Sequence, residues 1–237
     1  MTKSVLITGA SGGIGMRLAK AVISKGYRVV LHGNQHMGAI SDLGGLFPEQ
    51  ITAVAADIST ETGISQLSQA AGDCDVVLHC AGIPSAGISW KISAEEFRNV
   101  NAINHEAPFF ISQQLIPAMR SKGWGRIVFF SSIVAQTGIP GTAAYSASKS
   151  ALFGLTRTMA SELASNGITV NCIAPGYMDE GMIREIPEAM REQIIARTPI
   201  AKLSDTEGII KMVELLLSEE SNSITGQVLS VNGGLWM

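Results

Sequence analysis

Two residues near the middle of the chain, Tyr145 and Lys149, have the types and the spacing of a proton-transfer pair. They stand at positions i and i+4 of a helix-like stretch, so they lie on one helix face. A lysine ammonium beside a tyrosine favours the phenolate and lowers the phenol pKa from about 10 toward neutrality, which makes the phenol a usable general acid or base. Ser132 ends a strand-like run, where its hydroxyl can donate to an oxygen that gains negative charge as a carbonyl receives hydride. Together the three residues predict carbonyl–alcohol chemistry, although a solvated lysine and a tyrosine at the rim of the core are the alternative for the pair alone.

A glycine-rich loop near the start of the chain predicts a phosphate site. Gly9 permits a tight turn, Gly13 lets the backbone approach a pyrophosphate, and Gly15 allows close packing of a helix on a strand. Unpaired N–H groups at the start of the helix then bind phosphate. A glycine-rich turn without a ligand is the alternative, but a position between an N-terminal strand and a helix favours a dinucleotide site. The loop reads Thr8-Gly9-Ala10-Ser11-Gly12-Gly13-Ile14-Gly15.

The elements that must position these residues alternate between strand-like and helix-like along the chain. The strand-like runs are almost continuously apolar, as expected where both faces of a parallel sheet are covered. Alternation implies right-handed crossovers, and therefore an α/β fold with a doubly wound parallel sheet of about seven strands and helices on both faces. The expected strands are Val5–Thr8, Arg28–His32, Thr52–Ala55, Val76–His79, Arg126–Ser131, Thr169–Ile173 and Val228–Val231. The expected helices are Gly15–Ser24, Ser65–Ala71, Ala94–Lys122, Ala143–Asn166 and Asp205–Leu217.

Composition excludes several other classes of protein. Lys and Arg number 17 against 20 Asp and Glu, with no basic run, so we expect no binding to nucleic acid or to an anionic membrane. No apolar stretch approaches the roughly 18 residues of a spanning helix, and no signal peptide precedes the first strand-like run. The three scattered cysteines, Cys74, Cys80 and Cys172, fit a reducing cytoplasm, and the four histidines show no metal-ligand spacing.

The spacing TGxxxGxG over 8–15 differs from the plain GxGxxG, and with it the chain resembles the short-chain dehydrogenase/reductase family. The resemblance covers essentially the whole chain and implies a single Rossmann-type domain over residues 1–237. Its specificity comes from the joint order of several short segments. These are Asp57-Ile58, Ala81-Gly82, Asn104, Ser132, the pair Tyr145 and Lys149, Pro175-Gly176, and the terminal Val231-Asn232-Gly233-Gly234.

The resemblance implies a role for each matching catalytic position. Tyr145 would protonate the carbonyl oxygen, while Ser132 would orient and polarise it. Lys149 would hold the nicotinamide ribose hydroxyls and tune Tyr145. Asn104, which matches the family spacing better than Asn101, would position the water that relays protons to Lys149; a solvent-facing helix asparagine is the alternative. The cofactor-binding residues implied are Gly9, Ser11, Gly13, Ile14, Gly15, Asn34, Asp57, Ile58, Ala81, Gly82, Tyr145, Lys149, Pro175 and Gly176.

The end of the second strand-like run favours NADP(H), with NAD(H) as the alternative. An NAD site usually places an acid there, about 20 residues past the glycines, and this chain has none in His32-Gly33-Asn34-Gln35-His36. Gly12 stands where NADP-dependent relatives often carry a basic residue, so Asn34 is the best-placed donor to a 2′-phosphate, with His32 and His36 as further candidates. Asp57 is expected to contact the adenine and Ile58 to pack on the ring; the alternative for Asp57 is a cap of the next helix, and both roles could hold together.

Two departures from the family pattern affect cofactor contacts. His79-Cys80 replaces the usual pair of asparagines before Ala81-Gly82, and we expect Cys80 to be a small buried hydrophobe. Glu180 stands where relatives often carry a threonine that contacts the cofactor, so its side chain is expected to point elsewhere.

Within the family the chain is most similar to β-ketoacyl-acyl carrier protein reductases. The similarity implies NADPH-dependent reduction of a 3-oxoacyl thioester, linked to acyl carrier protein or coenzyme A. Gly123 and Asn166 stand where those reductases have basic docking residues, so Lys122, Arg120 and Arg126 are the candidate substitutes. The alternatives are a dehydrogenase of a small or cyclic secondary alcohol and a non-catalytic nucleotide-sensing protein. Segments carrying the similarity are Gly125-Arg126-Ile127-Val128, Gly167-Ile168-Thr169-Val170-Asn171 and Arg197-Thr198-Pro199.

The resemblance also implies a substrate lid and an oligomer. The lid corresponds to Tyr177–Pro199, whose apolar side chains suit an adaptable cover, although a helix pair packed on the core is the alternative. The two long helices are expected to pair across a two-fold axis in a homotetramer, with Phe109, Phe110, Phe153 and Met159 supplying contacts. The apolar lid residues are Met178, Met182, Ile183, Ile186, Met190 and Ile194.

Overall fold

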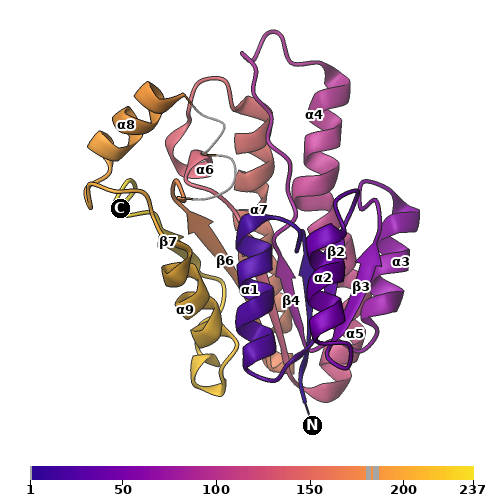
Figure 1. The fold of residues 1–237 in the computed structure, drawn as a ribbon. Helices are drawn as coiled ribbons and strands as arrows, with labels where there is room; N and C mark the ends of the chain where they lie inside the picture. Colours follow the sequence, from indigo (N-terminus) through magenta and orange to yellow (C-terminus); the bar gives the residue numbers. More distant parts are fainter. Residues whose placement is uncertain (1, 180–182, 184–186) are drawn as a thin grey trace.

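A computed structural model describes residues 2–179, 183 and 187–237, and its centre is a parallel sheet (Figure 1). The sheet has 7 strands in the order β3-β2-β1-β4-β5-β6-β7. The chain winds outward from β1 to β3, returns to place β4 beside β1, and then winds toward the other edge. The switch point therefore lies between β1 and β4, and the expected doubly wound α/β fold is confirmed. The strands are β1 Ser4–Thr8, β2 Arg28–Gly33, β3 Ile51–Ala55, β4 Val76–His79, β5 Gly125–Phe130, β6 Ile168–Pro175 and β7 Val228–Val231.

Helices cover both faces of the sheet because alternate strand residues point to opposite sides. On β1, Leu6 belongs to the apolar core under α3, α5 and α7, whereas Val5 and Ile7 belong to the core under α1, α2 and α9. Each fully buried Leu or Ile side chain contributes about 1.5–3 kcal/mol, which explains why most positions of the central strands are apolar. The main helices are α1 Gly13–Ser24, α2 Gly38–Leu46, α3 Glu61–Ala71, α4 Ala94–Asn101, α5 Ala107–Lys122, α7 Ala143–Leu163, α8 Glu188–Arg197 and α9 Thr206–Leu216.

The stretch expected as one helix over Ala94–Lys122 is interrupted by a π-helical turn at Ala102–Glu106. Pro108 follows at the start of α5. It has no N–H to donate to the Asn104 carbonyl, and its ring clashes with a carbonyl four residues earlier in a regular helix. The turn therefore widens at Asn104, as π-bulges do.

Other boundaries also differ from the expectation. The helix expected over Ala143–Asn166 ends at Leu163, and the 3-10 turn Ala164–Asn166 leads to Gly167 at φ 71°. Helix α2 and the short helix α6 (Val134–Thr137) were not expected, whereas α8 lies in Tyr177–Pro199, for which a helix pair was the alternative to a lid. Glycines and a weak apolar pattern hide α2 in the sequence, because glycine has a poor helix propensity.

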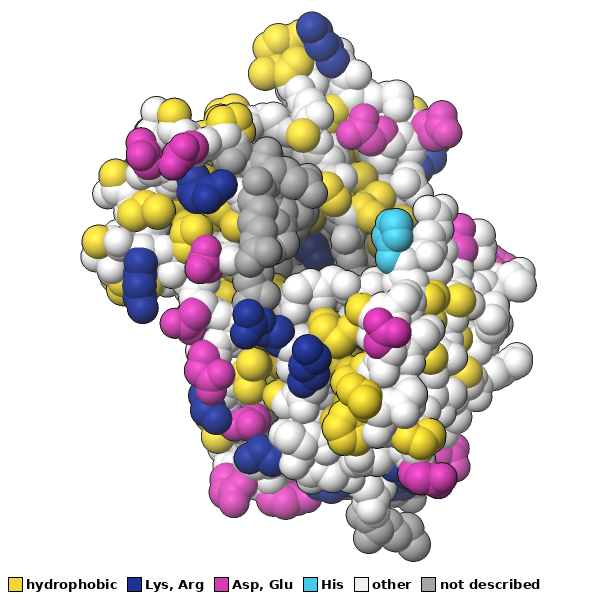
Figure 2. Space-filling model, in the orientation of Figure 1, with side chains coloured by type: hydrophobic (Ala, Val, Ile, Leu, Met, Phe, Trp, Pro, Cys, Tyr) yellow, Lys and Arg dark blue, Asp and Glu magenta, His cyan; other side chains and the backbone are white. Residues whose placement is uncertain are grey.

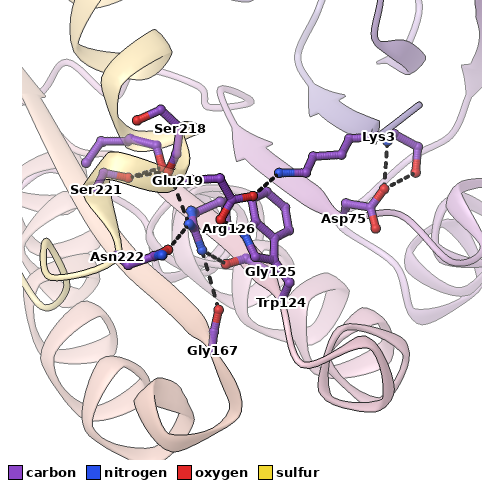
Figure 3. Close-up of polar contacts among 12 residues, drawn as sticks. Lys3, Asp75, Trp124, Gly125, Arg126, Gly167, Ser218, Glu219, Ser221 and Asn222 are labelled. Atoms are coloured by element: carbon purple, nitrogen blue, oxygen red, sulfur yellow. Dashed lines mark hydrogen bonds and ion pairs between the residues drawn. The ribbon is translucent and has the colours of Figure 1, made fainter. Parts of the chain in front are cut away.

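A polar cluster around Arg126 lies at the amino edge of the sheet, where β5 begins (Figure 3). The Arg126 guanidinium lies 4.2 Å from the centre of the Trp124 ring and donates to the Ser218 carbonyl at 3.2 Å and to the Asn222 side chain. Lys3 lies 3.5 Å from the same ring and pairs with Glu219 at 2.7 Å. The cluster joins β5 to the segment after α9.

The amino-edge position corrects the expectation that Arg126 helps to dock a carrier protein. Its side chain is 0% exposed, so it cannot contact a partner. Lys122 pairs with Asp75 at 2.7 Å at the same edge. Ligands of this fold bind at the carboxyl ends of the strands, which form the opposite edge of the sheet.

The described part of the chain contains no helix long and apolar enough to cross a membrane. It also contains no group of three or more His, Cys, Asp or Glu side chains placed to hold a metal ion.

Replacing Arg126 with methionine should lower the free energy of unfolding by about 2–4 kcal/mol, because buried carbonyl and amide acceptors lose their donor. Arg120→Met, on an exposed side chain of α5, should change it by less than about 0.5 kcal/mol. Urea unfolding measures both. Equal, small effects of the two substitutions would show that the Arg126 cluster does not stabilise the fold.

Candidate active site

The glycine-rich loop packs directly against the segment that follows β4. Gly9 has φ 65°, and a Cβ on it would come within 2.6 Å of Ala81 Cα. A Cβ on Gly15 would lie 2.4 Å from the Gly9 carbonyl oxygen. The Ala81 N–H donates to Thr8 Oγ1 at 3.1 Å, which holds Ala81-Gly82 beside the loop. Only glycine fits at the two loop positions, as the sequence predicts.

The first turn of α1 has N–H groups that no side chain caps, because its N-cap residue is Gly12. Such a helix start attracts an anion through its N–H groups and its dipole. Ser11, Gly13, Ile14 and Gly15 surround this start. Figure 2 shows the molecular surface hollowed near the start of α1. The loop can therefore accept a pyrophosphate.

Asn34 and Asp57 follow β2 and β3 and are exposed at the same edge. Asp57 accepts hydrogen bonds from the Ser59 amide at 3.0 Å and the Ser59 hydroxyl at 2.7 Å, and these bonds lower its pKa. The cap of α3 is Thr60, whose Oγ1 accepts from the Gly63 amide at 3.0 Å, so the alternative of Asp57 as a helix cap is wrong. The Ile58 side chain is buried in the core, so it offers little surface for the expected packing on an adenine ring.

The Lys149 ammonium is buried at the carboxyl end of β5. Its Nζ donates to the Phe130 carbonyl oxygen at 2.7 Å. Burial lowers the pKa of Lys149 to about 8, so the side chain stays charged at neutral pH. A Cβ on Gly82 would lie 3.1 Å from Lys149 Nζ and 3.3 Å from Asn104 Oδ1. The structure thus brings Gly82, Asn104 and Lys149 to one small space.

Asn104 is buried on the π-helical turn and joins three segments. Its Oδ1 accepts from the Ile83 amide at 2.8 Å, and its Nδ2 donates to the Ile83 carbonyl at 3.0 Å and to Ser148 Oγ at 3.0 Å. The alternative of a solvent-facing asparagine is therefore wrong. Asn104 fixes the loop after β4 against α7, next to the Lys149 side chain.

Tyr145 on α7 and Ser132 after the end of β5 lie side by side, near Lys149. Burial raises the pKa of Tyr145, and a hydrogen bond from the Ser132 side chain lowers it in part. Lys149 Nζ lies 5.9 Å from the centre of the Tyr145 ring and donates to a carbonyl instead. The expectation that Lys149 brings the pKa of Tyr145 toward neutrality is therefore wrong. The phenol is neutral and holds a proton to donate.

His79 and Cys80, which depart from the family pattern, lie on opposite sides of the sheet. His79 is buried, hydrogen-bonds Ser112 Oγ at 2.8 Å and stacks on Phe129 at 5.2 Å between ring centres. Burial lowers the pKa of His79 to about 3. Cys80 packs against the other apolar core, and burial raises the pKa of its thiol. Both therefore pack as neutral groups, as expected for Cys80.

Pro175-Gly176, at the end of β6, is held by main-chain hydrogen bonds. The Pro175 carbonyl accepts from the Ile133 amide at 2.8 Å, and the Gly176 amide donates to the Val231 carbonyl at 2.9 Å. In the expected lid, Met178 and Ile183 are buried, as the alternative of packing on the core predicts, and Met190 on α8 is exposed. Glu180, Met182 and Ile186 lie outside the described residues.

Comparisons with known proteins agree with this geometry. A family model described as enoyl-(acyl carrier protein) reductase matches residues 9–236. The chain belongs to the short-chain dehydrogenase/reductase family. The resemblance in the sequence is thereby confirmed. This membership makes the chain an NAD(P)-dependent oxidoreductase acting on CH–OH and C=O groups.

Its relatives are named after several different substrates. A 3-oxoacyl-[acyl-carrier-protein] reductase FabG of Rickettsia felis is 35% identical and aligns over 99% of this chain and 97% of its own length. The FabG of Escherichia coli is 34% identical over 99% of this chain and 98% of its own length. A structure described as an NAD(P)-dependent gluconate 5-dehydrogenase from Beutenbergia cavernae, with bound NADP, has a TM-score of 0.92 at 30% identity, covering 98% of this chain and 96% of its own. A 4-hydroxyisoleucine dehydrogenase complexed with NADH also reaches 0.92, at 27% identity, covering 99% and 98%.

Sequence reasoning missed the groups that hold the expected residues in place. The Ser131 hydroxyl donates to the Lys149 carbonyl at 2.8 Å, and Ser148 bridges Asn104 and the Tyr145 carbonyl. Lys149 and Asn104 also bond main-chain groups of Phe130 and Ile83. The type of a residue gives no indication of such main-chain bonds. Ser148, between Tyr145 and Lys149, was the one partner that the motif itself contained.

The lowered pKa of Lys149 makes a prediction about stability. Between pH 8 and 10.5 the unfolded chain binds the proton that the folded protein releases, so the free energy of unfolding of the wild type rises with pH through this group. In the absence of cofactor, the stability of Lys149→Met relative to wild type should therefore be highest below pH 8 and decline as the pH rises.

Urea unfolding between pH 7 and 10 measures this difference, with Lys20→Met, an exposed lysine of α1, as the baseline. A difference between Lys149→Met and wild type that stays constant with pH would show that burial does not disfavour the ammonium.

Proposed function

We propose that this chain reduces a 3-oxoacyl thioester, linked to acyl carrier protein or coenzyme A, to the 3-hydroxyacyl form with NADPH. The observation that carries the proposal is the convergence of Ser132, Tyr145 and Lys149 at the carboxyl edge, beside an uncapped glycine-rich helix start. The full-length similarity to the FabG reductases supports the thioester as the substrate class.

The residues present fit a nicotinamide dinucleotide. The glycine loop offers N–H groups to a pyrophosphate, and Gly82 leaves open a space that a Cβ would fill, 3.1 Å from Lys149 Nζ. Asp57 and the main chain of Ile58 would hold the adenine, and Lys149 the nicotinamide ribose hydroxyls. Pro175-Gly176 and Ala81-Gly82 would flank the nicotinamide half. The chemistry that the bound reduced cofactor supplies is a hydride for the carbonyl carbon.

Proton transfer in the proposed reaction belongs to Tyr145. Its phenol, kept neutral by burial, donates a proton to the substrate oxygen as negative charge develops there. The Ser132 hydroxyl orients that oxygen. The Lys149 ammonium, charged below pH 8, would hold the nicotinamide ribose hydroxyls next to the phenol. Asn104 holds the loop after β4 in place through Ile83. It would there position the water that relays protons to Lys149.

NADPH is the proposed cofactor because β2 ends without a carboxylate. Asn34 is exposed directly after Gly33, the last residue of β2, and carries an amide that can donate to a 2′-phosphate. His32 is buried, so it is not available as a phosphate donor, contrary to its candidacy from the sequence. NAD(H) remains the alternative, because relatives in this fold are seen with either cofactor.

Homotetramer formation through α4, α5 and α7 is also proposed. Phe97 on α4 and Phe110 on α5 are 45% and 43% exposed, which suits an apolar contact. Met159, one of the residues expected there, is buried within the core and cannot contribute. Docking of a carrier protein would use groups other than Arg126.

A second candidate function is oxidation of a sugar acid or a similar small alcohol. The gluconate 5-dehydrogenase structure, with its TM-score of 0.92, is the observation that favours it. The non-catalytic alternative has no such support, because Tyr145, Lys149, Ser132 and Asn104 are all present.

Purified protein should consume NADPH with a short 3-oxoacyl coenzyme A ester, and Tyr145→Phe should reduce kcat by roughly 10²–10⁴-fold because the proton donor is lost. The variant should still bind NADPH. Absorbance of NADPH gives the rate, and its fluorescence gives the affinity.

Two results would contradict this assignment in different ways. Near-normal turnover by Tyr145→Phe would remove Tyr145 as the donor. Turnover of 5-keto-gluconate but not of the thioester would replace the substrate class and leave the proton donor standing.

Asn34→Asp should shift cofactor preference toward NADH. A carboxylate near a 2′-phosphate repels it, so kcat/KM for NADPH relative to NADH should fall by roughly tenfold. Asn34→Ala, which removes the amide without adding charge, is the control and should cause a smaller fall. An unchanged ratio in Asn34→Asp would place the 2′-phosphate away from this residue.

A further inference from the structure

The His32 imidazole occupies a position between two loops of the proposed cofactor site. It lies near the end of β2, the strand between β1 and β3, and its side chain is buried. Its Nδ1 lies 3.2 Å from the Gly9 nitrogen, and its Nε2 lies 3.0 Å from the Ala56 carbonyl oxygen. One side chain thus contacts both the glycine loop and the first residue after β3.

The two partners determine which nitrogen carries the proton. The Gly9 amide can only donate, so Nδ1 must accept, and the Ala56 carbonyl can only accept, so Nε2 must carry the hydrogen. A second proton, on Nδ1, would set two donors against each other and break the bond to Gly9. The contact with the glycine loop therefore exists only while His32 is neutral.

Main-chain bonds make the same connection and show how tightly His32 is placed. The Ala10 amide donates to the His32 carbonyl at 2.8 Å, and the Ala56 amide donates to the Gly33 carbonyl at 3.1 Å. The imidazole adds a bridge at the outer end of this connection, immediately before Asp57. The spacing between the start of the phosphate loop and Asp57 is therefore set by these main-chain bonds together with the imidazole.

We propose that His32 is a positioning residue for the dinucleotide, which sets the distance between the pyrophosphate loop and the adenine-facing loop and does so only as the neutral Nε2–H tautomer. The proposal rests on the cofactor site described under the proposed function. It gives the protein a cofactor affinity that declines on acidification, through a residue that does not touch the cofactor.

The charges around His32 agree with a neutral ring. Burial lowers the pKa of His32, and the Asp57 carboxylate, from the loop after β3, raises it in part. Among the described residues, the glycine loop over 8–15 contributes no titratable side chain. The ring is therefore neutral at physiological pH and gains a proton only below the ordinary histidine range.

Two substitutions separate the two bonds of the bridge. His32→Asn places an amide oxygen near the Nδ1 position and can still accept from Gly9, but it is too short to reach Ala56. His32→Leu removes both bonds at similar volume. Neither side chain titrates, so both remove any pH dependence that His32 causes.

The experiment is calorimetric binding of NADP⁺, which is stable in acid, to the whole protein between pH 5 and 7.5. At pH 7.5, Kd should rise by roughly tenfold in His32→Leu and by less in His32→Asn, with kcat at saturating cofactor unchanged. As the pH falls, wild-type affinity should decline toward that of His32→Leu, so that the ratio of the two Kd values shrinks. Titration of the cofactor phosphate affects both proteins and cancels in the ratio.

Three outcomes would overturn the proposal. A ratio that stays constant with pH, in variants that unfold at the wild-type urea concentration, would leave His32 a merely structural residue. Loss of the acid effect in His36→Gln but not in His32→Asn would assign it to the exposed imidazole beyond Asn34. Wild-type protein that binds neither NADP⁺ nor NAD⁺ at any pH would instead remove the cofactor site itself, and the proposed function with it.

Discussion

The buried Lys149 ammonium is the group around which the carboxyl edge of the sheet is arranged. A cation removed from water is costly unless it has strong partners, and here the Phe130 carbonyl, at 2.7 Å, is the partner that the protein provides. The lowered pKa of Lys149, about 8, shows that this one hydrogen bond does not fully offset the cost of burying the charge. A ligand that adds hydroxyl partners to Lys149 relieves it. In the proposed site, ribose hydroxyls would be such partners, and the buried ammonium would favour binding at some expense of stability.

Backbone geometry delivers the other groups to this cation. Pro108 forces the π-helical turn that carries Asn104 inward, and Asn104 then fixes the loop of Gly82 and Ile83. Glycine at position 82 keeps that loop from filling the space beside Lys149 Nζ. Pro108 and Asn104, on neighbouring helical turns, and Gly82, in the loop after β4, thus shape the space beside Lys149 Nζ.

Much of this edge could be predicted from the sequence, because apolar runs mark buried parallel strands and the glycines of the phosphate loop have a steric reason. Tyr145, Lys149 and Ser132 were recognisable by type and spacing. The π-helical turn was not, since its cause is a proline whose effect appears four residues earlier. The neutral Tyr145, the buried Arg126 and the His32 bridge depend on burial and on main-chain partners, which no residue pattern records. The sequence also does not show at which end of the sheet a basic side chain lies, and this excluded Arg126 as a contact for a carrier protein.

The most direct test of this account is the proton balance of cofactor binding. Hydroxyl partners for the Lys149 ammonium should raise its pKa, so wild-type protein should take up protons when it binds NADP⁺ at pH 8–9. Calorimetry in two buffers of different ionisation enthalpy measures that uptake directly. The account predicts clear uptake by the wild type and little by Lys149→Met. Equal uptake by both proteins, or none by the wild type, would contradict the central place given to Lys149.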